Sequence, residues 1–68
     1  MDVLVNGKSR AVQDGAGLRM LLESLRLPSL ESGIAVCLNG EVVRRQDWER
    51  TALRDRDEVE IVTAAQGG

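Results

Sequence analysis

The stretch from Leu18 to Leu27, LRMLLESLRL, decides the fold class, because it is the only long segment with a helical pattern. Its leucines recur at i, i+3, i+4 and i+7, which places them in one apolar stripe with charged residues on the other side. We expect one amphipathic helix from about Ala16 or Gly17 to Leu27, ended by Pro28, since a residue before proline disfavours the α region. The stripe is typical of a core face; a partner-binding helix is the less favoured interpretation. Such a helix must pack against a second layer.

Two strands joined by a tight turn are expected ahead of this helix. Residues 1–6 carry valines at positions 3 and 5, an alternation that suits a strand. Asn6-Gly7 favours a type I′ hairpin turn, since that turn needs positive φ at both central residues. Residues 8–12 then predict a polar return strand at an edge of the sheet. Asp14-Gly15 breaks that strand, and Asp14 is a candidate cap for the helix.

A second hairpin is expected after the helix and a polar connector over residues 29–33. Residues 34–38, IAVCL, form a nearly continuous apolar run, typical of a strand with both faces at least partly covered. Asn39-Gly40 predicts the turn, and residues 41–44 a short return strand.

The last strand is expected at residues 58–63, EVEIVT, which alternate cleanly with Val59 and Ile61 pointing inward. Before it, one short helical turn is expected around residues 47–49. Trp48, the only aromatic residue, is expected to cover one edge of a small core.

The order of these elements predicts an α+β fold with the β-grasp arrangement of ubiquitin-like proteins. The mixed sheet would have four to five strands, with one helix packed across one face. A right-handed crossover through the helix would place the first and last strands side by side in the middle. We expect residues 1–64 to form the β-grasp domain and residues 65–68 a flexible C-terminal diglycine tail.

Composition excludes several classes of function. The 68 residues carry nine basic and eleven acidic side chains, a net charge of −2, which gives no electrostatic case for nucleic acid. The absence of histidine, with one lysine and no tyrosine, disfavours an enzyme and predicts no metal site. No apolar run approaches the ~20 residues that cross a bilayer. The start lacks a signal-peptide pattern and Cys37 is a single cysteine, so a cytoplasmic location is expected.

The sequence ends in Gly67-Gly68, a pair whose simplest interpretation, taken alone, is a frayed end. Two residues without Cβ could, however, enter a channel too narrow for other side chains. A terminal carboxylate is an anion at neutral pH and a poor electrophile until an enzyme activates it. The dipeptide therefore has a possible chemical use that the rest of the chain must support.

Four segments together resemble ThiS, the family of sulfur carrier proteins of thiamin biosynthesis. They are MDVLVNG, LNGEVVRRQDW, DRDEVEIV and the closing QGG, and the resemblance covers the whole chain. The positions that match the family pattern are Asn39, Val43, Arg44, Trp48, Asp57, Gly67 and Gly68. The chain departs from the pattern twice. It lacks the proline common between the valine and the basic residue, and Arg56 stands where a glycine is common.

The resemblance implies a carrier and not an enzyme. An E1-like adenylating enzyme would use ATP and Mg²⁺ to activate the carboxylate of Gly68, and the chain itself would hold no cofactor. A sulfur donor, typically a persulfide, would then displace AMP and leave a thiocarboxylate. Thiazole synthase would take that sulfur. Gly67 would provide clearance for the tail.

Partner docking is expected on the sheet face away from the helix, where strict alternation places Leu4, Ala35, Cys37 and Val62. With Gln66 these are the candidate docking residues. The competing interpretation is that scattered exposed apolar residues carry no function. Cys37 fits a small strand residue better than a sulfur relay.

Two alternatives to a thiamin carrier stay open. One is another diglycine-ended sulfur carrier, chiefly the small subunit of molybdopterin synthase or a carrier of cysteine biosynthesis. The other is a plain β-grasp interaction domain in which the diglycine is incidental.

Overall fold

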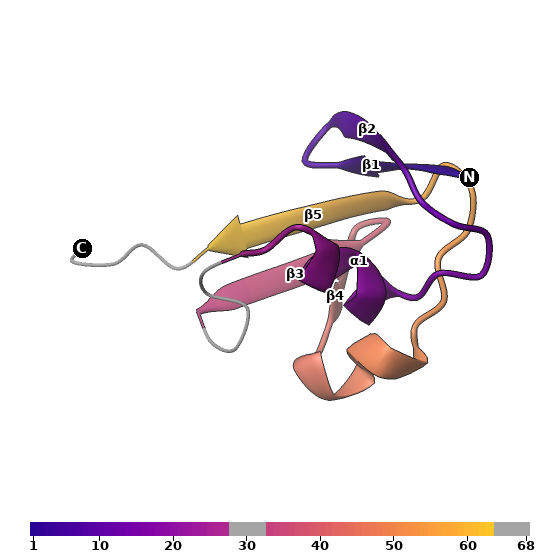
Figure 1. Ribbon diagram of the computed structural model, residues 1–68. Coiled ribbons are helices and arrows are strands. Elements are labelled where there is room, and N and C mark those ends of the chain that lie inside the picture. Colours follow the sequence, from indigo (N-terminus) through magenta and orange to yellow (C-terminus); the bar gives the residue numbers. More distant parts are fainter. Residues whose placement is uncertain (28–32, 64–68) are drawn as a thin grey trace.

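A computed structural model describes residues 1–27 and 33–63 of the chain (Figure 1). Within these ranges it contains five strands, one α-helix and one 3₁₀ helix. In chain order they are β1 (Asp2–Val5), β2 (Lys8–Ala11), α1 (Leu18–Ser24), β3 (Ile34–Leu38), β4 (Glu41–Val43), η1 (Arg45–Arg50) and β5 (Glu58–Thr63).

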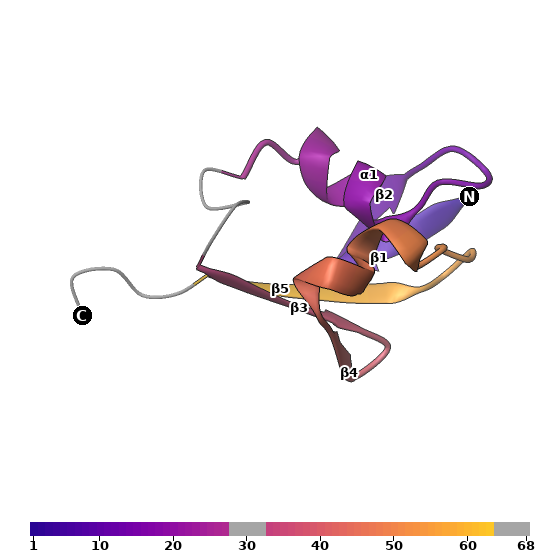
Figure 2. The same cartoon turned by 90° about the horizontal axis from the view of Figure 1, so that it is seen from below.

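The strands form one sheet in the order β2-β1-β5-β3-β4. β1 and β5 are parallel neighbours in the middle, and the other pairs are antiparallel. Figure 2 shows α1 and η1 on one side of the sheet, which leaves the other side open. The expected β-grasp arrangement, with the first and last strands side by side, is confirmed.

Both hairpins turn where the Asn-Gly pairs predict. Asn6 and Gly7 have φ of 50° and 85°, and Asn39 and Gly40 have φ of 52° and 88°. Positive φ at both central residues is what a type I′ turn requires. The turns set the registers Val5↔Lys8 and Leu38↔Glu41, and these registers decide which side chains share a face.

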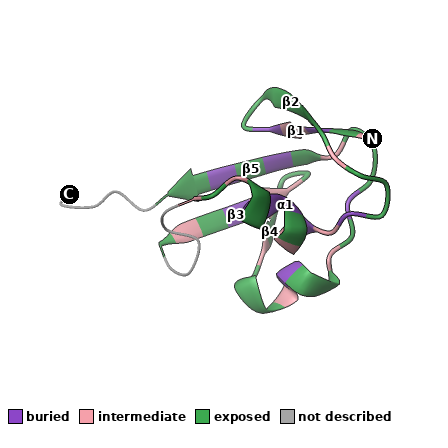
Figure 3. Ribbon diagram, in the orientation of Figure 1, coloured by how far each residue is buried: buried purple, intermediate pink, exposed green. Residues whose placement is uncertain are grey.

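The core lies between α1 and the sheet, and Figure 3 shows the buried positions on both layers. Its members are Val3, Val5, Leu18, Leu21, Leu22, Val36, Trp48, Leu53, Val59 and Ile61. Trp48 is only 1% exposed, so it lies inside the core and not at its edge. Its Nε1 donates to the Val43 carbonyl at 3.0 Å, and the guanidinium groups of Arg19 and Arg45 lie 5.8 and 5.7 Å from its ring centroid. The indole thus joins η1, α1 and the end of β4.

The helix is shorter than its leucine pattern predicts at the C-terminal end. It stops at Ser24, and Arg26 adopts φ of 55°, a left-handed conformation that cannot continue an α-helix. The predicted end at Leu27 is therefore wrong, because the backbone turns at Arg26, before Pro28 is reached. The predicted cap is also wrong: the Asp14 carboxylate accepts from the N-terminal ammonium at 3.2 Å, and Gly17 is the N-cap.

Candidate functional site

The site of interest is the end of β5, the strand that leads toward the terminal glycines. β5 lies between β1 and β3 and ends at Thr63. The predicted tail residues Gln66, Gly67 and Gly68 lie outside the described residues, as does the proposed domain boundary at residue 64. What the structure defines is the strand that holds the tail and the surfaces on its two sides.

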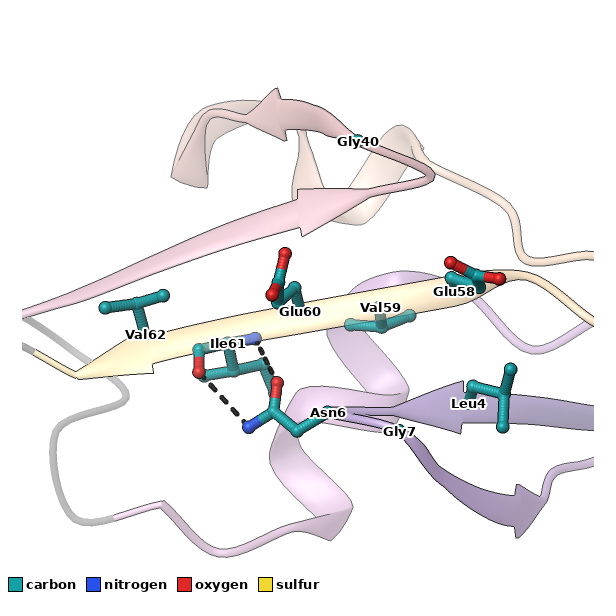
Figure 4. A pocket seen from close by; sticks show the side chains of 9 residues that line it. All are labelled: Leu4, Asn6, Gly7, Gly40, Glu58, Val59, Glu60, Ile61 and Val62. Atoms are coloured by element: carbon teal, nitrogen blue, oxygen red, sulfur yellow. Dashed lines mark hydrogen bonds between the residues drawn. The ribbon is translucent and has the colours of Figure 1, made fainter.

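The side chain of Asn6 holds β5 where β1 stops. The ladder between β1 and β5 ends at Val5↔Val59, and the Asn6 backbone N–H donates to the Val59 carbonyl at 2.9 Å. The Asn6 carboxamide then takes the place of the next strand residue. Its Oδ1 accepts from the Ile61 backbone N–H at 2.7 Å, and its Nδ2 donates to the Ile61 carbonyl at 3.2 Å (Figure 4).

Asn39 binds the start of β5 with both its side chain and its backbone. Its Oδ1 accepts from the Glu58 backbone N–H at 2.9 Å, and its own backbone N–H donates to the Glu58 carbonyl at 2.7 Å. Its Nδ2 donates to the Asp57 carboxylate at 3.0 Å. The asparagines of the two hairpin turns therefore both bind the central strand, Asn39 at its start and Asn6 at Ile61. Sequence reasoning assigned both residues to turns and missed this second use of their side chains.

The sheet face away from α1 carries the predicted residues Leu4, Ala35, Cys37 and Val62. Ala35 and Val62 are direct cross-strand partners and Cys37 follows Ala35 on the same face of β3, whereas Leu4 lies on β1, opposite Glu58. Two carboxylates of β5 lie on the same face, because Leu4 pairs with Glu58 and Cys37 pairs with Glu60. Figure 4 shows Leu4, both glutamates and Val62 along this face, where they line a depression of about 550 Å³. Neither glutamate side chain has an ion-pair partner among the described residues.

Two apolar side chains of this open face are strongly exposed. Val42, paired with Cys37, is 72% exposed, and Val62, paired with Ala35, is 58% exposed. Val42 and the two glutamates follow from the same alternation that gave the predicted residues, so the pattern was sufficient to find them. The open face is thus mixed, with an acidic centre and apolar flanks.

Potential metal-ligating side chains are dispersed over the part of the chain that the structure describes. No group of three or more potential metal ligands gathers among residues 1–27 and 33–63. Cys37 is a half-buried free thiol on the open face. Within the same ranges no helix has the length and apolarity needed to span a bilayer.

Comparison with known proteins decides the family. The family model of ThiS matches residues 3–68, which is nearly the whole chain and includes both terminal glycines. The chain belongs to the ThiS family. No curated protein matches the sequence.

Solved structures of a ThiS protein agree in fold and in length. The crystal structure of the thiamine biosynthesis protein ThiS from Geobacter metallireducens is 38% identical, with a TM-score of 0.81 and full coverage of both chains. A solution structure of a thiamine biosynthesis protein from the same organism is 34% identical, with a TM-score of 0.79, and the match covers all of this chain and 88% of the other.

The ThiS pattern residues within the described ranges have structural roles here. Asn39 bonds Asp57 and so ties the second hairpin to the start of β5, while Trp48 bonds the Val43 carbonyl. The position where a glycine is common is also explained, because Arg56 has φ of 71°, a conformation that favours glycine. Asn39 and Asp57 thus support the start of the strand that leads to the tail.

Proposed function

We propose that this ThiS-family chain is a sulfur carrier of thiamin biosynthesis whose Gly68 carboxylate receives and delivers the sulfur. The observation that carries the proposal is the family match through residue 68. The position of β5 supports it. A central strand, fastened at Glu58 by Asn39 and at Ile61 by Asn6, leads toward the reactive end.

The chemistry requires activation in partner enzymes. In an E1-like adenylating enzyme, an oxygen of the Gly68 carboxylate attacks the α-phosphorus of Mg²⁺-bound ATP, and pyrophosphate leaves. A persulfide sulfur then attacks the acyl carbon, and AMP leaves with the carbon–oxygen bond electrons. A thiol attacks the sulfur–sulfur bond of the resulting acyl disulfide, which forms a new disulfide and releases the thiocarboxylate. Thiazole synthase consumes that sulfur nucleophile.

The chain contributes to these steps a tail that is long enough to enter an active site and narrow enough to fit a channel there. Residues 65–68 can span at most about 13–14 Å when extended, enough to enter an active site while the folded domain stays outside. Gly67 lacks a side chain and so fits a narrow channel beside the reacting carbonyl. The acid–base groups come from the partners, so the chain acts as a substrate and not as an enzyme.

The open face is the proposed docking surface for these enzymes. Leu4, Ala35, Cys37 and Val62, with Gln66 from the tail, are the docking residues that we propose. The carboxylates of Glu58 and Glu60 add a charge preference, because a partner surface with basic side chains would neutralise them. A mixed face of this kind favours an enzyme partner with both apolar and basic groups.

Pyrophosphate release tests the activation step. With the adenylating enzyme, ATP and Mg²⁺, we expect release that depends on the chain and disappears when Gly68 is deleted. Release that continues without Gly68, or no release with the intact chain, would contradict the assignment of Gly68.

A further inference from the structure

A second surface lies on the helix side of the sheet, where β5 extends past β1. It is a groove of about 410 Å³ between the β1–β2 hairpin and the residues that follow α1. Val5, Ile61, Leu25 and Leu27 give it an apolar lining, and Thr63 lies at its end. Leu25 and Leu27 are only half-buried, so their remaining apolar surface is available in the groove.

The groove runs along a stretch of β5 that no described strand pairs on the β1 side. Backbone groups of alternate strand residues face the same neighbour, and those of Val59 and Ile61 face β1 and Asn6. The N–H and C=O of Thr63 therefore face the same side. β1 ends at Val5, and the Asn6 side chain already hydrogen-bonds the Ile61 backbone. No described strand therefore pairs with Thr63 on the β1 side of β5. Figure 1 shows β5 continuing beyond the turn of the β1–β2 hairpin.

The rim of this groove is positively charged. Lys8 and Arg10 lie opposite Val5 and Val3 on β2, so their side chains are on the helix side with the groove. Neither makes a hydrogen bond or ion pair with a described residue. Acidic residues are absent from the described lining of the groove. Basic residues on β2 also protect that strand's own outer edge, but this does not account for the free edge of β5 beside them.

We propose that an extended segment of the adenylating enzyme adds to β5 at Thr63 as a further strand. Its backbone would bond the Thr63 N–H and C=O, its apolar side chains would contact Leu25 and Leu27, and its acidic side chains would pair with Lys8 and Arg10. Gly68 is five residue steps beyond Thr63, a reach of at most about 17–18 Å. The segment therefore lies at the entrance of the enzyme's active site. This inference rests on the proposed function, since it takes the enzyme that activates Gly68 as the partner.

Charge reversal tests the basic rim. We expect Lys8→Glu/Arg10→Glu to weaken binding to the purified adenylating enzyme roughly tenfold by calorimetry, less so at high salt. The matched control is Arg54→Glu/Arg56→Glu, which makes the same charge change before the other end of β5 and should leave affinity within about twofold. Equal losses in the two double variants would overturn the proposal, because net charge alone would then explain both.

Proline at position 63 tests the strand pairing separately. Thr63→Pro removes an N–H that bonds nothing in the described chain, so the free protein stays folded and affinity falls roughly fivefold. Thr63→Val keeps the N–H and should bind normally.

In the wild-type complex the Thr63 amide should become protected from hydrogen exchange. An exchanging Thr63 amide in a saturated complex would overturn strand addition, while thiocarboxylate formation in the same sample would leave the carrier function intact. Failure of the wild-type chain to bind the enzyme at all would overturn both.

Discussion

The carboxamide of Asn6 is bonded at both ends to the backbone of Ile61, at 2.7 Å to its N–H and 3.2 Å to its carbonyl. A turn residue thus substitutes for a strand residue on the central strand of the sheet. Beyond Ile61, on that side, the strand is unpaired among the described residues. Asn6 therefore marks the point on β5 beyond which, among the described residues, only β3 pairs with the strand.

Replacing Asn6 with glycine isolates this role. Glycine accepts the positive φ of the turn but removes both side-chain bonds to Ile61, so we expect a loss of about 1–2 kcal/mol in the free energy of unfolding. Hydrogen exchange at the Ile61 amide should accelerate more than at the amides that bond β3. Asn39→Gly is the comparison at the other end of β5, because it removes the Oδ1 bond to the Glu58 N–H and the Nδ2 bond to Asp57 and should leave the Ile61 exchange rate unchanged. If Asn6→Gly left the Ile61 exchange rate unchanged, the two Asn6 side-chain hydrogen bonds would not stabilise β5.

Arg56→Gly should stabilise the protein. Arg56 has φ of 71°, which brings its Cβ close to the following carbonyl oxygen. Glycine has no Cβ, so the substitution should raise the free energy of unfolding by about 1 kcal/mol. The exposed contact with Asp55 at 3.8 Å is too weak to offset this gain. Chemical denaturation measures the change. Arg54→Gly, at a position without positive φ, should be neutral or destabilising; a similar gain from both variants would argue against backbone strain as the cause.

Side-chain size at position 67 should control activation. We expect Gly67→Phe to block thiocarboxylate formation because the ring cannot enter the channel that accepts the tail, while Gly67→Ala reduces the rate to an intermediate value. Neither substitution should shift the thermal midpoint. Normal activation of the phenylalanine variant by the adenylating enzyme would refute the clearance role of Gly67.

Charge reversal on the open face should weaken docking. Glu58→Lys/Glu60→Lys replaces two carboxylates that have no ion-pair partner among the described residues, and we expect affinity for the partner enzymes to fall roughly tenfold. Glu41→Lys/Glu49→Lys makes the same charge change away from that face, since Glu41 pairs with Leu38 on the other side of the sheet and Glu49 belongs to η1. Affinity that drops equally in both variants would point to net charge and not to the surface.

Much of the fold follows from local sequence patterns whose predicted elements are present in the structure. The Asn-Gly pairs, the leucine stripe and the alternation of residues 58–63 each depend on a few neighbouring residues, so sequence alone predicts them. The helix end was mispredicted because the turn at Arg26 is a non-glycine residue with positive φ, which carries no strong sequence signal. The side-chain hydrogen bonds from Asn6 and Asn39 to β5 were missed because each joins residues far apart in the chain. The turns already explained why both positions are asparagine.

The candidate site was predicted less completely than the fold. The docking residues were chosen for being apolar, so Glu58 and Glu60, which share their face, were left out. The groove at Thr63 depends on where β1 stops relative to β5. That offset is a property of strand register, which no single segment of the sequence contains.

The most direct test of the central claim is the intact mass of the chain after incubation with ATP, Mg²⁺, the adenylating enzyme and a persulfide donor. We expect the mass increase of one oxygen replaced by sulfur, located at Gly68 by fragmentation and absent from a chain that lacks Gly68. An unchanged mass, with an enzyme preparation that remains active on its own carrier, would contradict the assignment of this chain as a sulfur carrier.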